Sequence, residues 1–298
     1  MIYITKTEWN KIFIPKLTNE KEFCNELTQL KKINNILIQI ISLIIPQSLN
    51  ILKQNILYSS MIYYYKYILY NNISHSEINQ IKKIIICTSC ILLSLKQNNI
   101  KISIDYLTKD ILSLINSNSN KKYLIEEINN YVSEIEYNIL YTIGFNMAID
   151  NPYTIFKPLK VYLEQKGIEK MLLNEIFDSI NDYIINSILF PFYLYYTSYD
   201  IAISCIQITK NKYKYNFIDV DDFIKINKIE VDKNNIEECS NYIIKVSEDL
   251  NRRSIKEEKG HTNNENSNNN NSNNIGNNGN NNDGIYLHFD IIRNIKTN

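Results

Sequence analysis

Apolar residues recur every three or four positions over much of this 298-residue chain. Two clear stripes consist of Ile78, Ile81, Ile85, Thr88, Leu92 and Leu95, and of Leu124, Ile128, Tyr131, Ile135, Ile139 and Ile143. Residues three and four apart lie on the same face of an α-helix, so this spacing predicts amphipathic helices. Only six glycines and five prolines leave little room for hairpins. The sequence therefore predicts an all-α fold.

The predicted helices fall into two groups that meet at Asn151 and Pro152. A residue before proline avoids helical dihedrals, while proline suits a first helical turn. Gly144 is expected to end the helix before this junction. The first group covers about residues 21 to 45, 53 to 70, 76 to 97, 103 to 115 and 121 to 143. The second covers about residues 153 to 165, 169 to 189, 199 to 211, 219 to 226 and 234 to 252.

One short segment repeats between the two groups without a gap. Ser89-Cys90-Ile91-Leu92-Leu93-Ser94 in the first corresponds to Ser204-Cys205-Ile206-Gln207-Ile208-Thr209 in the second. Small residues at such spacing let neighbouring helices approach closely. The match suggests that each group has one such helix at its centre.

The ends of the chain differ in composition from the predicted helices. Residues 1 to 20 form an N-terminal extension. Residues 259 to 284 are rich in asparagine and have almost no apolar side chains, so this tract cannot offset the entropy of ordering and is predicted to be disordered. A short tail follows at residues 285 to 298 and regains apolar residues.

Composition excludes several functional classes. The chain has 32 lysines and arginines and 32 aspartates and glutamates, so its net charge does not favour binding to nucleic acid or anionic lipid. Apolar runs are too short for a membrane span, the N-terminus lacks a signal core, and five scattered cysteines suit a reducing compartment. A soluble protein inside the cell is expected, with no membrane partner and no direct contact with nucleic acid.

No arrangement typical of an enzyme or a metal site is visible. Cys87 and Cys90 are spaced as a Cys-x-x-Cys pair, but no second pair or nearby histidine completes four ligands. Neither a Ser-His-Asp set nor a phosphate-binding glycine loop is present. We therefore expect no catalytic residues, no cofactor and no metal.

Four segments carry a resemblance to the cyclin family, and their order and spacing make it specific. Residues 136 to 154 contain Glu136, an Ile-Leu pair ending at Leu140, a helix end at Phe145 and an Asn-Pro where the family has His-Pro. They resemble the fifth helix of transcription-type cyclins and the link beyond it. Residues 86 to 96, a run of small residues ending in Lys96, resemble the third helix. Residues 59 to 67 and 196 to 202 resemble the second helix and the third helix of the second repeat.

The resemblance covers about residues 21 to 252 and implies a cyclin fold of two consecutive five-helix repeats, at 21 to 150 and 151 to 258. It implies a regulatory subunit that binds and activates a cyclin-dependent protein kinase. The segments are closest to cyclins of transcription and RNA processing, whose complexes reach the transcription or splicing machinery through the kinase. The expected location is the nucleus, with the cytoplasm as a second compartment.

The resemblance also implies which residues contact the kinase. Carried over position by position, Lys96 and Glu136 hydrogen-bond the kinase backbone. Apolar contacts come from Leu93, Leu140, Phe145 and Met147.

Two departures bear on the kind of cyclin. Gln97, Asn98 and Asn99 stand where the family usually has an apolar residue and two glutamates, which leaves open a cyclin-like scaffold that does not activate its partner. The substrate-recruiting patch of cell-cycle cyclins is not visible at residues 30 to 40, which favours the transcription branch. A DNA-binding protein resembling general transcription factor IIB is the other alternative, but neither its basic surface nor its zinc ribbon is evident.

Overall fold

The computed structural model describes residues 5–75, 77–118 and 122–265, and their side chains as far as Arg252. Within these ranges every regular element is a helix, as the sequence predicts. The chain divides into a compact unit at Met1–Arg252 and a second unit at Arg253–Asn298. Among the described helices, none is both long and apolar enough to cross a membrane.

The first repeat consists of five helices: α3 (Glu20–Ile44), α4 (Asn50–Tyr70), α5 (Gln80–Gln97), α6 (Ile104–Ser117) and α7 (Ile125–Thr142). Their bounds follow the predictions, with later starts for α5 and α7. Asn79 caps α5 by accepting from the Lys82 amide at 2.9 Å, so Ile78 lies before the helix. At α7, the Leu124 amide donates to Glu127 at 3.0 Å, which places the helix start after Leu124.

The second repeat begins with a 3-10 turn at Pro152–Ile155, where Asn151 accepts from the Tyr153 amide at 2.9 Å. Five helices follow, with a second 3-10 turn at Phe192–Leu194 between α9 and α10. They are α8 (Phe156–Gln165), α9 (Lys170–Ile188), α10 (Ser198–Tyr213), α11 (Val220–Ile226) and α12 (Lys233–Glu265). All five were predicted.

The last helix is longer than predicted. The expected helix ended at about residue 252, and disorder was expected from residue 259, whereas α12 continues to Glu265. The rest of the Asn-rich tract, residues 266–284, and the tail at residues 285–298 lie outside the described residues.

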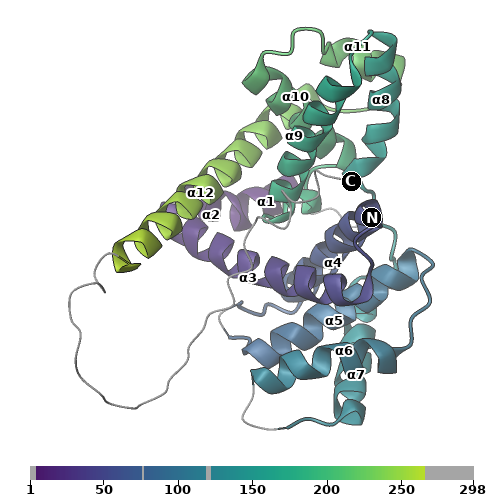
Figure 1. The fold of residues 1–298 in the computed structure, drawn as a ribbon, viewed down its shortest axis with the longest axis vertical. Coiled ribbons are helices and arrows are strands. Elements are labelled where there is room, and N and C mark those ends of the chain that lie inside the picture. The colour runs from purple at the N-terminus through teal and green to yellow at the C-terminus, as the bar shows by residue number, and fades with distance from the viewer. Residues whose placement is uncertain (1–4, 76, 119–121, 266–298) are drawn as a thin grey trace. The chain divides into compact units, whose positions relative to one another are not determined.

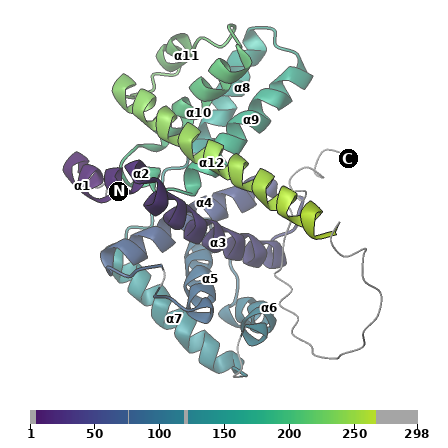
Figure 2. The same ribbon diagram turned by 90° about the vertical axis from the view of Figure 1, so that its left-hand side faces the viewer.

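Helix α5 lies at the centre of the first repeat, packed against α3, α4, α6 and α7 (Figure 1 and Figure 2). Every residue from Lys83 to Leu95 is buried. Close packing on all sides explains the small residues of this helix, because a hydroxymethyl side chain lets a neighbouring backbone approach.

Hydrogen bonds of the repeated segment show that the two halves are built alike. Ser89 of α5 donates to the carbonyl of Val132 in α7 at 3.0 Å, and Ser204 of α10 donates to that of Ile236 in α12 at 3.0 Å. In each repeat, therefore, the matched serine joins the third helix to the fifth.

The other end of the segment joins the third helix to the second. Ser94 donates to the carbonyl of Ile56 in α4 at 3.2 Å, while the hydroxyl of Thr209 lies 3.3 Å from that of Ser179 in α9. The short sequence match thus marks equivalent positions in two related helical repeats.

Two further helices precede the first repeat, α1 (Lys6–Ile12) and α2 (Ile14–Thr18). The sequence predicts no helix in this extension. Its apolar residues Trp9, Phe13 and Leu17 are spaced by four and are fully buried. Trp9 stacks on Tyr195, with ring centroids 5.5 Å apart, so the extension is part of the core.

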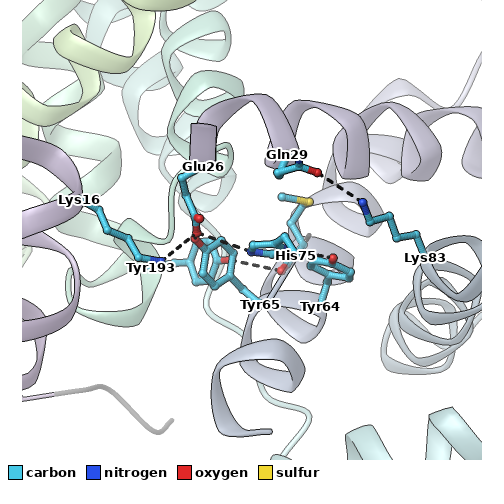
Figure 3. Close-up of polar contacts among 9 residues, drawn as sticks. Lys16, Glu26, Gln29, Tyr64, Tyr65, His75, Lys83 and Tyr193 are labelled. Carbon is cyan, nitrogen blue, oxygen red and sulfur yellow. Dashed lines mark hydrogen bonds and ion pairs between the residues drawn. The ribbon is translucent and has the colours of Figure 1, made fainter. Parts of the chain in front are cut away.

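A polar network around Glu26 of α3 connects this helix to α2 and to the loop after α4 (Figure 3). Glu26 Oε1 accepts from Lys16 at 3.2 Å and from the Tyr65 hydroxyl at 2.8 Å, and it lies 3.6 Å from His75 Nε2. His75 Nδ1 is 3.1 Å from the Tyr64 hydroxyl. Burial opposes ionisation, but the hydrogen bond from His75 and the charge of Lys16 lower the pKa of Glu26 to about 2.

Candidate partner-binding surface

Lys96 and Glu136 lie together at the surface. Lys96 is in the last turn of α5, where the helix dipole favours a cation, and it forms an ion pair with Glu136 of α7. The side chain of Lys96 is 50% exposed and that of Glu136 is 12% exposed. The structure therefore brings together the two charged residues that the resemblance implied, on two helices that pack side by side.

The four predicted apolar residues differ in position. Phe145 is exposed, and Leu140 and Met147 are half-buried against the core. Leu93, in contrast, is fully buried, which does not agree with a surface contact by this side chain. Since α5 is surrounded on all sides, the side chains of Lys83 to Leu95 face other helices, and the surface begins at Lys96.

The end of α7 presents Phe145 in an unusual backbone conformation. Gly144 has φ +61° and ends the helix as predicted, and Phe145 also has a positive φ of +57°. Its amide donates to the carbonyl of Leu140 at 2.8 Å. A left-handed conformation costs about 1 kcal/mol or more at a bulky residue, and here it occurs where the Phe145 side chain is exposed.

Two tyrosines of α7 join Phe145 at the surface, and sequence analysis did not single them out. Tyr137 is 59% exposed, Tyr141 71% and Phe145 60%. The rings of Tyr137 and Phe145 meet edge to face with centroids 6.4 Å apart. We call these three residues the aromatic face. Their spacing of four residues was a signal available in the sequence.

The predicted core stripe of α7 needs a correction for this reason. Leu124 and Tyr131 are exposed, while Val132 is buried beside Ile128 and Ile139. The helix is therefore rotated relative to the predicted stripe, and its tyrosines point away from the core.

Tyr63 connects the two ends of this surface. Its hydroxyl lies 3.0 Å from Gln97 Oε1 and donates to the carbonyl of Met147 at 2.9 Å. The ring is buried in α4, and burial raises the pKa of its hydroxyl. Gln97, one of the departures from the family pattern, thus helps to fix the end of α5 to the link beyond α7.

The Cys-x-x-Cys pair is not at the surface. Cys87 and Cys90 are fully buried, and burial raises the pKa of both thiols, which disfavours the thiolate needed for metal binding or redox chemistry. In the described ranges there is no group of three or more His, Cys, Asp or Glu side chains suited to a metal ion.

Of three comparisons with known proteins, only the one with solved structures found similar chains. No protein-family model matches the sequence, and no curated protein matches it. A chain of the yeast TFIIK (Kin28/Ccl1/Tfb3) complex, solved by cryo-electron microscopy, is 18% identical with a TM-score of 0.53; the match covers 82% of this chain and 96% of that one. A chain in the crystal structure of the yeast RNA Pol II CTD kinase CTDK-1 complex is 16% identical with a TM-score of 0.56; the match covers 82% and 72%. These neighbours have the cyclin fold, and the fold of this chain is therefore that of a cyclin.

Proposed function

We propose that this chain is a cyclin, a regulatory subunit that binds and activates a cyclin-dependent protein kinase in transcription or RNA processing. The observation that carries the proposal is the ion pair of Lys96 and Glu136, which joins α5 to α7, the helix that ends just before the exposed Phe145. A nuclear location follows from such a role.

The structural neighbours support the class of kinase. One neighbour belongs to a complex named as an RNA Pol II CTD kinase, and the other to the TFIIK complex of Kin28, Ccl1 and Tfb3. We infer a kinase partner of the same kind, through which the chain would act on the transcription machinery.

In the proposed mechanism the phosphoryl chemistry belongs to the kinase. The cyclin selects one conformation of the kinase. In this conformation the catalytic lysine of the kinase forms an ion pair with its glutamate, and the activation loop of the kinase is open. Leu140, Phe145 and Met147 supply the apolar centre of the interface. Lys96 and Glu136 then hydrogen-bond the kinase backbone, since their mutual bond leaves further ammonium hydrogens and carboxylate lone pairs free.

The double variant Lys96→Ala, Glu136→Ala tests this proposal. The kinase is the one that co-purifies with the wild-type chain. We expect its Kd for the variant to be at least tenfold higher than for wild type, because two charge-assisted hydrogen bonds worth roughly 1.5 to 3 kcal/mol each are lost. The melting temperature should change little, since the Lys96 end of the pair is half exposed and a pair that solvent reaches contributes only about 0 to 1 kcal/mol to folding.

The matched control is Lys160→Ala, Glu164→Ala, which removes an exposed pair of 3.8 Å on α8. It should alter neither binding nor stability. Unchanged kinase binding by the Lys96, Glu136 variant together with a large loss of stability would refute the proposed interface. Kinase that binds wild-type protein without gaining activity would instead identify a scaffold.

A further inference from the structure

Helix α7 carries an unbalanced charge. Between Ile125 and Thr142 it contains Glu126, Glu127, Glu134 and Glu136 but no lysine or arginine. Glu126 and Glu127 are in the first turn, where they offset the positive end of the helix dipole. Glu134 and Glu136 lie further along, so the second half of the helix combines their charges with the negative end of the dipole.

The aromatic face lies at this negative end. Tyr137 and Tyr141 are one turn apart, and Phe145 follows the helix. Three large, exposed rings at one end of a helix are a candidate contact surface for a partner. The edge-to-face contact orients the rings of Tyr137 and Phe145 relative to each other.

The chemistry of this face favours a cation. The faces of aromatic rings are electron-rich and attract ammonium and guanidinium groups. Lys16, Lys166, Lys212 and Lys245 lie over aromatic rings elsewhere in the described part of the chain, whereas no cation–ring contact involves the aromatic face. The nearby Lys96 is engaged by Glu136.

Three carbonyls at the helix end already accept a hydrogen bond within the chain. Asn138 accepts from the Thr142 hydroxyl at 2.8 Å, and Leu140 and Tyr141 accept from the amides of Phe145 and Gly144 at 2.8 and 3.1 Å. A cation would therefore be held by the ring faces, with Glu134, three residues before Tyr137 on the same helix, as the neighbouring carboxylate. A planar guanidinium suits this better than an ammonium, since it can stack on a ring while donating to a carboxylate.

We infer that the aromatic face of Tyr137, Tyr141 and Phe145 binds an arginine side chain on the segment of the kinase that contacts α5 and α7. The inference rests on the proposed function, and the ion pair of Lys96 and Glu136 would set the register of the same interface. Affinity for a kinase then depends on whether its contacting segment carries arginine at this point.

The test compares Tyr141→Leu with Tyr141→Phe. Tyr141→Leu keeps an apolar side chain but removes the ring, and we expect the Kd for the kinase to rise about fivefold to tenfold, the range of a partly desolvated cation–ring contact. Tyr141→Phe keeps the ring, and its Kd should stay within about twofold of wild type.

Tyr106→Leu, at an exposed tyrosine of α6, is the matched control and should leave the Kd unchanged. Equal binding by wild type and Tyr141→Leu would overturn the inference, as would equal losses in both Tyr141 variants.

A second measurement does not depend on the kinase. The wild-type chain and Tyr141→Leu are titrated with two alanine-based helical peptides, one carrying two arginines and one carrying two glutamines at the same positions, while tyrosine ring resonances are followed by NMR. The inference requires larger shifts with the arginine peptide, and loss of that preference in Tyr141→Leu. If wild-type protein captures no kinase but prefers the arginine peptide, the proposed function fails and the cation site stands. If it captures a kinase but shows no preference, the cation site fails and the proposed function stands.

Discussion

At the scale of single residues, Glu26 shows how one largely buried carboxylate, 14% exposed, can connect distant parts of the chain. Its partners come from α2, α4 and the loop after α4, and their positive charge and hydrogen bonds outweigh the cost of burial. Ionised Glu26 therefore stabilises the fold, because the carboxylate would lose these partners on unfolding.

Glu26→Gln should lower the free energy of unfolding at pH 7 by about 1 to 3 kcal/mol, the range for a buried hydrogen-bonded charge that loses its partners. The pKa of Glu26 falls from the ordinary 4.5 to about 2 in the folded chain, so its contribution is complete above pH 4.5 and is lost as the pH falls towards 2. Urea unfolding at pH 7 and pH 3 should thus show a smaller difference between variant and wild type at pH 3. Glu164→Gln, at an exposed ion pair, is the control and should show little difference at either pH. A difference that stays constant with pH would contradict this role.

At the scale of elements, α1 and α2 are short helices that tertiary contacts stabilise. Helices of seven and five residues are far too short to persist alone. Trp9 stacks on Phe13 with centroids 4.8 Å apart and contacts Phe190 edge to face at 6.5 Å. Lys245 of α12 also donates to the carbonyl of Leu17. The pair of helices is thus held by residues from the second repeat.

Trp9→Ala should lower the free energy of unfolding by about 3 to 5 kcal/mol, because it leaves a large cavity within an aromatic cluster. Ile51→Ala, at an exposed position of α4, is the comparison and should stay within about 0.5 kcal/mol of wild type. Chemical denaturation followed by circular dichroism measures both. A loss below 1 kcal/mol for Trp9→Ala would mean that the extension is not part of the core.

At the scale of the whole molecule, both repeats belong to the compact unit at Met1–Arg252. Gln54 of α4 donates to Asn181 of α9 at 2.9 Å, and Asn151 donates to Asn55 at 2.7 Å. The Tyr193 hydroxyl donates to the carbonyl of Met61 at 3.2 Å. These bonds cross the predicted boundary at residue 150, so the repeats are not expected to separate easily.

Limited digestion with proteinase K should therefore shorten the chain from the Asn-rich tract, whose composition predicts disorder, before it cuts near Asn151. Mass spectrometry should find an early, persistent fragment that retains residues up to about 252 in one piece. Early cleavage at the junction, with two fragments that each remain folded, would show that the repeats are independent domains.

The sequence by itself predicted the existence of the helices from α3 to α12, the new helical turn after Asn151 and the helix end at Gly144, although it did not predict the length of α12. Each depends on local spacing or local backbone preference, which a single sequence displays directly. The meeting of Lys96 and Glu136 was implied by the family resemblance, since no local pattern links residues on separate helices.

Only the tertiary structure decided which faces of the helices are covered. Periodicity shows that a helix has an apolar side but not how many neighbours surround it. A surface contact was therefore expected of Leu93, which is fully buried in a helix packed against four others. The same limit applies to Tyr131 and Val132. They are adjacent in sequence, but Tyr131 is exposed and Val132 is buried. The exposure of the aromatic face and the burial of Trp9 could not be predicted for the same reason. Whether a large side chain is exposed depends on residues that are distant in the chain and close only in the folded protein.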